Sequence, residues 1–504
     1  MYCKLKDDFC LRGWELLPTG MVRRLSGEVG FFTPKVYRAI IKACSALPVE
    51  SPLFSPEERE MLKELLAAGI LEESPTPAPL TARQAYRAYP NRFLRSVHWA
   101  VTGNCNSRCR HCYMSAPSGG IGEFSHEECM RIVGEMAAAG VRTVSLTGGE
   151  ALLRRDFFDI VDALTEADIL VNVVMSNGFL VNEETLDAFE ERGIRPEFNI
   201  SFDGVGCHDW LRGVAGAEEA AVRAFALCRE RGFPTGAEYC LHRGNLAALR
   251  ESVKLLSSLG VSALKVNRLS LEGEGAGLAD YAISREEEFR AYLDYIPAYY
   301  EDDLSISLML SGFFAGNAKN CSIPFVKNAE GEDCGNDCIC GHARNTMYIT
   351  PEGYIVPCIP MGSTRGGRQS VASCDTARTR PSVAVGGRQS VASCDTARTR
   401  PSVAVGGRQR FPNIRELSLA EALRDSSYLD FIDTRLRDYF AHNPGCGTCE
   451  YRNRCSGGCR GRVAGGDLLA RDEDACAFFR EGWYDKLLEL LAGANRRITL
   501  LPPH

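Results

Sequence analysis

Strand-like and helix-like segments alternate through the middle of the chain, and this alternation limits the possible fold more than any other feature of the sequence. Short apolar runs centre on 97–102, 143–147, 170–176, 197–203, 235–241 and 263–269, and amphipathic segments occupy about 125–140, 156–167, 182–193, 217–232, 245–260 and 284–298. Strands that alternate with helices form a parallel sheet with right-handed crossovers. The sequence therefore predicts an α/β domain of six strand–helix units over residues 95–300.

Three cysteines follow the first of these strands. Cys105, Cys109 and Cys112 have the spacing C-x3-C-x2-C, on the loop that leaves the strand. Electron-transfer cubane clusters normally take four cysteine ligands, so three thiolates can hold a [4Fe–4S] cluster with one iron open for a substrate or cofactor. A zinc knuckle or free buried cysteines are the alternatives, although zinc sites favour four ligands in C-x2-C pairs.

The cysteine triplet resembles the defining motif of the radical S-adenosylmethionine (SAM) enzymes, and the six strand–helix units match the partial (β/α)6 barrel of that family. The resemblance implies that the open iron chelates SAM, and that one-electron reduction cleaves SAM to methionine and a 5′-deoxyadenosyl radical. It places the chemistry at the carboxyl ends of the barrel strands, where the cysteine loop also lies.

The same resemblance implies a set of SAM contacts, although no catalytic acid or base can be named. Gly148, Gly149 and Glu150 end the second strand and correspond to the family motif beside the amino group of SAM. Polar residues at the ends of the third and fourth strands suit the ribose and carboxylate, with ordinary turn chemistry as the alternative for each; they are Ser176, Asn199, Ser201 and Asp203. His111 and Tyr113 flank the last cysteine, and the family usually places an aromatic residue at position 111, near the adenine.

Composition excludes several functional classes. The chain has 504 residues, 22 of them cysteine, and a net charge of −7. A protein that binds nucleic acid would normally show a basic patch or stripe, so we expect no nucleic-acid partner. The N-terminus lacks a signal peptide and no apolar run approaches the about 18 residues of a membrane span, so we expect a cytoplasmic protein with no membrane partner. In that compartment cysteines serve as metal ligands more often than as disulfides.

A second set of cysteines lies in the C-terminal third. Their spacing resembles the SPASM extension of radical SAM enzymes, here over 301–365 and 406–485, which binds two auxiliary [4Fe–4S] clusters. Carried over by position, the first cluster takes Cys446, Cys449, Cys455 and Cys476, and the second takes Cys334, Cys340, Cys358 and Cys459. Cys338 could replace Cys334. Two structural zinc sites are the alternative, since C-x2-C pairs also bind zinc.

Residues 1–75 form a predicted small domain. Strand-like residues over 22–32 precede a helix that begins at Pro34, and a second helix begins after Ser55, which forms a predicted capping box with Glu58. The pattern resembles the winged-helix element through which peptide-modifying enzymes bind a leader peptide, as a strand added to a sheet edge. The alternative is a packing appendage without a ligand. We expect a linker over 76–94 and a C-terminal tail over 486–504.

One segment of the chain is duplicated. Residues 366–385 recur letter for letter at 386–405. Packed repeats keep apolar positions and let the others drift, so strict identity indicates a recent duplication. The segment is rich in Arg, Ser, Thr and Gly, which predicts an exposed, disordered insertion whose Cys374 and Cys394 are not ligands. A basic recognition arm is the alternative.

Together these features predict an oxidoreductase that abstracts hydrogen from a ribosomally made peptide and installs a crosslink, thioether, epimer or other oxidative modification. Its partners would be the precursor peptide, bound through its leader, and a flavodoxin- or ferredoxin-type electron donor. An anaerobic sulfatase maturase is an alternative, but Ile359 stands where that group has an aspartate base. A non-catalytic iron–sulfur electron-transfer or scaffold protein is another, and it would gain nothing from an open iron.

Overall fold

The structure is a computed structural model that describes residues 1–116, 121–326, 333–340, 342–362, 411–424, 426–463 and 469–493, with the backbone of 497–498. The duplicated segment 366–405 lies outside the described residues, so its low order stays a prediction. In the part of the chain that is described, no helix has the length and apolar character needed to cross a bilayer.

The predicted parallel sheet is present, and its six strands follow chain order. They are β7 (Ser96–Thr102), β8 (Thr143–Gly148), β9 (Leu170–Ser176), β10 (Glu197–Ser201), β11 (Thr235–Leu241) and β12 (Ala263–Arg268). Each strand pairs in parallel with the next one. The alternation of strands and helices therefore predicted the number, order and direction of these strands.

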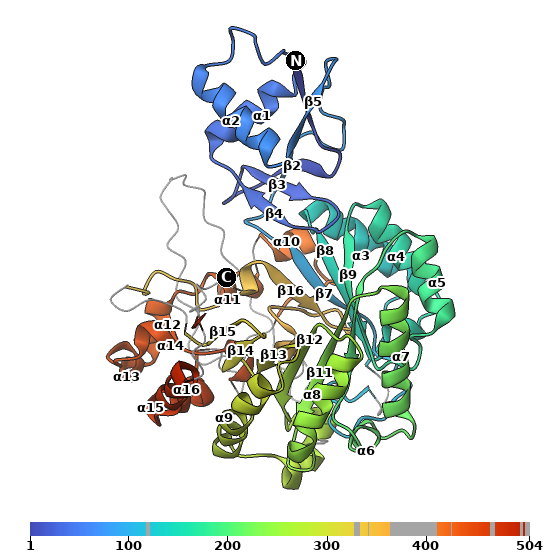
Figure 1. The fold of residues 1–504 in the computed structure, drawn as a ribbon, viewed down its shortest axis with the longest axis vertical. Helices are drawn as coiled ribbons and strands as arrows, with labels where there is room; N and C mark the ends of the chain where they lie inside the picture. The colour runs from blue at the N-terminus through green and yellow to red at the C-terminus, as the bar shows by residue number, and fades with distance from the viewer. Residues whose placement is uncertain are drawn as a thin grey trace, which may run out of the picture.

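Helices connect these strands and cover the outer side of the sheet (Figure 1). The main ones are α3 (His126–Ala139), α4 (Phe157–Glu166), α5 (Glu183–Glu191), α7 (Ala217–Arg231), α8 (Leu249–Ser258) and α9 (Arg285–Glu301). Helix α3 begins at a capping box of Ser125 and Glu128 and buries Cys129, Ile132 and Met136 against the sheet. A short extra helix, α6 (His208–Arg212), follows β10. Short 3₁₀ turns occupy η2 (Ala151–Leu153), η3 (Leu246–Ala248) and η4 (Gly273–Tyr281).

The two faces of the sheet differ in polarity. On β10, Phe198 and Ile200 are fully buried in the core under the helices. Because side chains alternate along a strand, Glu197, Asn199 and Ser201 lie on the opposite, inner face. The inner face of the partial barrel is therefore polar along β10.

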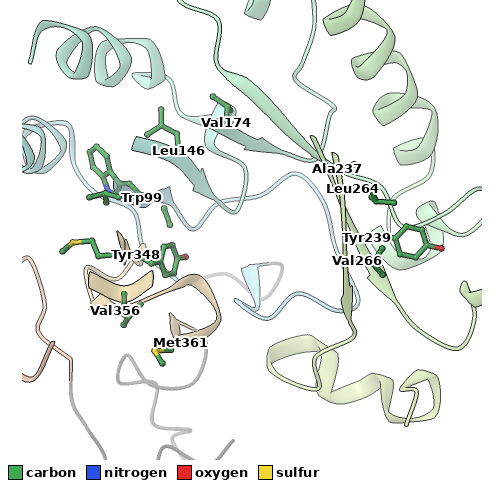
Figure 2. Close-up of a cluster of buried hydrophobic side chains, with 14 of the residues drawn as sticks. Trp99, Leu146, Val174, Ala237, Tyr239, Leu264, Val266, Tyr348, Val356 and Met361 are labelled. Carbon is green, nitrogen blue, oxygen red and sulfur yellow. The ribbon is translucent and has the colours of Figure 1, made fainter. Parts of the chain in front are cut away.

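The C-terminal part of the chain extends this sheet at both edges into one of 12 strands. One edge gains β13 (Ser307–Leu310), β14 (Phe314–Gly316), β15 (Asn320–Ser322) and β18 (Arg497–Ile498). The other edge gains β16 (Thr346–Ile349), which runs parallel to β7, and β17 (Ile355–Val356). Figure 2 shows Trp99 of β7 near Tyr348 of β16 and Val356 of β17 in one core. The region predicted as a separate SPASM domain thus shares its sheet and core with the barrel.

Small helices form the rest of the C-terminal region. They are α10 (Leu419–Ala422), α11 (Ser427–Asp433), α12 (Leu436–His442), α13 (Pro444–Gly447), α14 (Arg452–Cys455), α15 (Glu473–Arg480) and α16 (Trp483–Gly493), with turns η5 (His342–Arg344), η6 (Ile359–Gly362) and η7 (Arg460–Arg462). The expected tail over 486–504 therefore begins inside helix α16. Leu487 and Leu491 are buried, one helical turn apart, and this amphipathic spacing explains the helix.

The N-terminal region folds into two small sheets and two helices. Strand β1 (Tyr2–Leu5) pairs with β5 (Leu71–Ser74), and a second sheet has the order β4 (Val29–Phe31), β3 (Gly20–Arg23), β2 (Phe9–Trp14), β6 (Arg87–Tyr89). Helices α1 (Pro34–Ala43) and α2 (Pro56–Ala67) pack on the first sheet, and the predicted Ser55–Glu58 capping box is present.

The structure differs from the expectation of a linker over 76–94. Strand β6 lies within that range and pairs in parallel with β2, and its Tyr89 ring packs 5.6 Å from that of Trp14. The N-terminal region contacts the barrel at the amino-terminal ends of its strands, where Arg24 and Arg83 both pair with Asp168, just before β9. The cysteine loop leaves the opposite end of the barrel.

Candidate functional site

The first three cysteines lie on the loop after β7, and each of their sulfur atoms accepts a hydrogen bond. Cys105 Sγ accepts from the backbone N–H of Ser107 at 3.4 Å, and Cys112 Sγ accepts from that of Ala116 at 3.4 Å. Cys109 Sγ accepts from Arg212 Nη1 at 3.7 Å. Burial raises the pKa of Cys105 and Cys112, and the N–H donors directed at their sulfur atoms act against it, towards the thiolate form that binds iron. Within the described residues, no three His, Cys, Asp or Glu side chains surround a single metal-ion position. Three cysteine thiolates on one loop are a donor set that fits a cubane cluster, in which each thiolate would bind a different iron.

Helix α6 holds this loop in place through its backbone. The N–H of Arg108 donates to the carbonyl of Arg212 at 3.1 Å, and the N–H of Arg110 donates to that of Leu211 at 2.8 Å. Gly213, which ends the helix, packs so closely that a Cβ there would lie 2.2 Å from the carbonyl oxygen of Arg108. A side chain at position 213 would push the cysteine loop away from α6.

The predicted contact between Asp203 and SAM stays a prediction, and in the structure the Asp203 carboxylate is paired within the chain. Asp203 is fully buried; Oδ2 accepts from Arg212 Nε at 2.7 Å and Oδ1 from the Cys240 N–H at 2.9 Å. Burial alone would raise the pKa of Asp203, but Arg212 and His208 together outweigh it and the net pKa falls well below its usual range. Both carboxylate oxygens of Asp203 are hydrogen-bonded within the chain. Asp203 therefore affects the cysteine loop through its ion pair with Arg212.

The predicted contacts of Gly148 and Gly149 with SAM stay predictions, and in the structure both glycines pack closely against the chain itself. A Cβ at Gly148 would lie 2.2 Å from the carbonyl oxygen of Thr102, and one at Gly149 would lie 2.2 Å from that of Asn104. Gly148 also has a φ of 145°, a backbone conformation that residues with a side chain rarely adopt. The two glycines therefore allow Thr102 and Asn104, which precede Cys105, to pack closely against the end of β8.

Glu150 joins the ends of β8 and β9. Its Oε2 accepts from the Asn177 N–H at 2.8 Å and from Ser176 Oγ at 3.2 Å, and its side chain is fully buried. Burial raises the pKa of Glu150 to about 7, against these hydrogen bonds. Ser176, also a predicted SAM contact, is turned towards Glu150. The contacts expected between these two residues and SAM stay predictions.

His111 and Tyr113 lie beside the last cysteine. Burial lowers the pKa of His111 to about 4, with repulsion from Arg212 as the next cause, so the imidazole is neutral at pH 7. Its Nδ1 is buried and has no hydrogen-bond partner among the described residues. Burial raises the pKa of Tyr113 to about 12, against a hydrogen bond with Tyr348. An unpaired ring nitrogen beside the cysteine loop suits a ligand with hydrogen-bonding edges, as the adenine of SAM has.

Four of the predicted auxiliary ligands come together. Cys446, Cys449, Cys455 and Cys476 all line one cavity among α12, α14 and α15. The hydroxyl of Tyr439, in the same cavity, lies 3.5 Å from Cys446 Sγ. The resemblance to the SPASM extension assigns the same four cysteines to the first auxiliary cluster, and that assignment stays a prediction.

Only some of the cysteines assigned to the second auxiliary cluster lie near one another in the structure. Cys358 lies near the turn after Cys459, because a Cβ at Gly461 would be 3.4 Å from Cys358 Sγ. Cys340 and Cys358 both raise the pKa of Tyr428, after its burial, so both lie near that ring. Cys334 Sγ instead contacts Asn453 Oδ1 at 3.3 Å, and Cys338 Sγ contacts Arg435 Nη1 at 3.0 Å. The place of Cys334 in this set stays a prediction.

Two residues at the site were missed in the sequence. Arg212 stands out by no motif in the sequence, and only the fold brings it to Cys109. Asn177 follows Ser176, and its Nδ2 donates to Asn106 Oδ1 at 2.6 Å and to Ser107 Oγ at 3.1 Å. A polar run at the end of a strand was the available signal for Asn177.

Comparisons with known proteins agree with this geometry. Residues 99–256 match the family model of the radical SAM superfamily. An AdoMet-dependent heme synthase of Nitratidesulfovibrio vulgaris is 26% identical over 387 residues, which cover 76% of this chain and 92% of the relative. A PqqA peptide cyclase of Granulibacter bethesdensis is 24% identical over 265 residues, covering 51% of this chain and 66% of the relative.

Among solved structures, Streptococcus suis SuiB bound to precursor peptide SuiA aligns with a TM-score of 0.59 at 14% identity, over 94% of this chain and 99% of SuiB. This likeness shows a shared fold. The superfamily implies SAM and one [4Fe–4S] cluster as cofactors, and the three cysteines after β7 fit that cluster. Residues 99–256 therefore form a radical SAM domain, and the chain is an enzyme.

Proposed function

We propose that this enzyme is a peptide maturase that abstracts hydrogen from a ribosomally made peptide and installs a crosslink, thioether, epimer or other oxidative modification. When bound at the cysteine loop, the cluster and SAM together supply a carbon-centred radical that can abstract hydrogen from an unactivated carbon. The chain itself binds, orients and shields the reactants, since the cofactors carry the chemistry.

The observation that carries the proposal is the open edge of the N-terminal sheet. Strand β4 is the outer strand of the order β4-β3-β2-β6, and its Phe31 is 44% exposed. Leu25, in the turn before β4, is 80% exposed. An extended peptide can add to such an edge through backbone hydrogen bonds, with exposed apolar side chains beside it for selectivity. A leader segment bound here would tether its peptide to the barrel.

Residues around the cysteine loop hold the site rigid. Asp203 fixes Arg212, and Arg212 donates to Cys109 Sγ. Glu150 ties the ends of β8 and β9 through Ser176 and the Asn177 N–H. We assign to His111, neutral at pH 7, the binding of the adenine edge of SAM at its unpaired Nδ1.

The C-terminal cysteines support a one-electron oxidation of the peptide. The set Cys446, Cys449, Cys455 and Cys476 supplies the four thiolates of one cubane, and Cys334, Cys340, Cys358 and Cys459 are assigned to a second. Groups there can accept the electron left on an oxidised peptide. A flavodoxin- or ferredoxin-type protein is the proposed source of the electron for SAM cleavage.

A peptide assay tests the proposal. A short peptide encoded beside this protein is incubated with the reconstituted enzyme, SAM and reductant without oxygen, and its mass is measured. Loss of two hydrogen atoms indicates oxidation or crosslinking, and an unchanged mass with deuterium uptake from solvent indicates epimerisation. Formation of 5′-deoxyadenosine with no change in any such peptide would argue against the proposal.

A second candidate, the oxidation of a tetrapyrrole, is favoured by a different observation. The heme synthase relative aligns over 92% of its length, more than the peptide cyclase relative does. An iron porphyrin with propionate side chains, offered in place of the peptide in the same assay, tests this candidate. Loss of carboxyl groups from the porphyrin, with no change in the peptide, would favour it.

A further inference from the structure

A chamber with a few polar side chains in a mostly apolar wall lies on the inner face of the barrel, apart from the cysteine loop. Its volume is about 540 Å³, and β10, β11, β12 and β13 line it together with β14 and β15. Its walls include residues near the amino-terminal ends of the strands, such as Glu197 of β10, Gly236 of β11 and Ala263 of β12. A tightly packed barrel would fill this space with apolar side chains.

The two carboxylates of the chamber differ in their partners. Glu238 Oε2 accepts from Asn267 Nδ2 at 2.6 Å, and its Oε1 lies 3.6 Å from Lys265 Nζ. The carboxylate of Glu197 has no hydrogen bond or ion pair with any described residue, and burial alone raises its pKa. The charge of Glu238 is balanced within the chamber, whereas the carboxylate of Glu197 is without a partner.

Asn199 adds a second unpaired acceptor beside Glu197. Its Nδ2 is directed at Glu238 Oε1 at 3.5 Å, which fixes the orientation of the amide because the opposite orientation would set oxygen against carboxylate. Its Oδ1 is buried and has no partner among the described residues. A buried acceptor without a donor costs free energy, so a donor supplied by a ligand would be favoured there.

Gly236 leaves a notch between these two acceptors. A Cβ at Gly236 would lie 2.8 Å from Glu197 Oε1 and 3.5 Å from Asn199 Oδ1. Both oxygens therefore face the same small space, which opens into the chamber. Lys265 lies two strands away and is paired with Glu238.

We propose that this notch binds a cationic side chain of the substrate, the ammonium of lysine or the guanidinium of arginine, between Glu197 and Asn199. Such a group offers several N–H donors and a positive charge, which together match one carboxylate and one amide oxygen. The inference rests on the proposed peptide substrate. The carboxylates of a porphyrin would instead be repelled by Glu197.

The first test measures binding without turnover. Reconstituted full-length enzyme is titrated with N-acetyl-lysine methylamide and with the uncharged N-acetyl-norleucine methylamide, followed by saturation-transfer NMR. We expect the lysine probe to bind more tightly, and Glu197→Gln to weaken it about tenfold because one charged hydrogen bond is lost. Glu251→Gln, on the exposed side of α8, is the matched control and should change nothing. Equal binding of the two probes, or an unchanged Glu197→Gln variant, overturns the proposal.

Two further variants test the same site in case the Glu197→Gln protein does not fold. Gly236→Ala keeps every charge and fills the notch, displacing only the end of the Glu197 side chain, and it should abolish the preference for lysine. Glu197→Lys should reverse the preference, so that N-acetyl-glutamate methylamide binds more tightly than the lysine probe. A Gly236→Ala protein that keeps the wild-type preference counts against the site.

Turnover experiments distinguish a failure of the cationic site from a failure of the peptide-maturase proposal. If the lysine probe depends on Glu197 but no peptide is modified, the cationic site stands and the peptide-maturase proposal fails. If a peptide is modified, and replacing each of its lysine and arginine residues by norleucine leaves KM unchanged, the maturase proposal stands and the cationic site is wrong.

Discussion

Arg212 Nη1 lies 3.7 Å from Cys109 Sγ, and the Nε of the same guanidinium donates to Asp203 Oδ2 at 2.7 Å. Asp203 follows β10, and Cys109 lies on the loop after β7. The Arg212 side chain therefore links the end of β10 to a proposed iron ligand on the loop after β7. Burial would lower the pKa of Arg212, but Asp203 and the Cys109 thiolate outweigh burial and raise it. The guanidinium therefore stays charged beside the sulfur.

Replacing Arg212 should change the reduction potential of the cluster at the first three cysteines. Hydrogen bonds to cluster sulfurs and nearby positive charge stabilise the reduced form, so Arg212→Met should lower the midpoint potential by about 50 mV. A redox titration followed by EPR measures this shift. Arg110→Met is the matched control, because Arg110 donates to the Trp210 carbonyl rather than to a sulfur. An unchanged potential in Arg212→Met, or an equal shift in the control, contradicts the prediction.

Replacing the three cysteines after β7 should remove one cluster and leave the auxiliary sites. Reconstituted wild-type protein should hold about twelve irons, and the triple variant Cys105/Cys109/Cys112→Ala about eight, because each cubane carries four. The triple variant should form no 5′-deoxyadenosine. Iron and sulfide analysis with chromatography of the SAM products checks both expectations.

A cysteine outside the predicted ligand sets supplies the control for this series. Cys207→Ala should keep the full iron content, since the hydrogen bond of Cys207 Sγ among the described residues goes to the Gly244 carbonyl. Zinc in place of iron in the purified protein, or full iron content in the triple variant, would contradict the assignment.

Glu150 should make stability depend on pH. Burial raises the pKa of Glu150 from 4.5 to about 7, so above pH 7 the folded protein holds a buried charge that the unfolded chain exposes to water. Stability is therefore lost as the pH rises from 4.5 through 7. Glu150→Gln should stabilise the protein by up to about 3 kcal/mol at pH 8, and the difference should close as the pH falls towards 5. Thermal unfolding of both proteins at the two pH values measures it, and an equal difference at both would contradict the prediction.

The barrel could be predicted from the sequence because its pattern is local. Each strand is a short apolar run followed by an amphipathic helix, and the stripe of Cys129, Ile132 and Met136 on α3 is buried as its spacing predicted. The cysteine loop could be placed for the same reason, because it directly follows β7. Strand β6 could not be predicted, since its partner β2 lies more than seventy residues earlier.

Side-chain roles at the site were harder to predict than its position. Asp203 follows β10 and Gly148 ends β8, where a ligand contact is an ordinary expectation, and in the structure Asp203 pairs with Arg212 and Gly148 packs on Thr102. The contact between Arg212 and Cys109 joins residues 103 positions apart. Such pairings depend on how loops from different strands meet, and no local pattern records that.

Blocking the open edge of β4 should weaken binding of the leader peptide. Residues 19 and 32 and residues 23 and 28 are hydrogen-bonded pairs of the β3–β4 ladder, so by alternation the N–H groups of Val29 and Phe31 point away from β3. Val29→Pro removes one outward donor without breaking the ladder, as proline can at an edge strand. We expect it to weaken leader binding about tenfold, measured by fluorescence anisotropy of a labelled leader segment.

Two comparisons make the edge experiment specific. Like Val29→Pro, Val29→Ala removes the valine side chain, but it keeps the backbone N–H. It should therefore bind the leader nearly as tightly as the wild type does. SAM cleavage without peptide should be unchanged in both variants, because β4 lies at the amino-terminal end of the barrel and the cysteine loop at the other. If alanine and proline weaken binding equally, side-chain packing rather than strand addition holds the leader; if neither weakens it, the leader binds elsewhere.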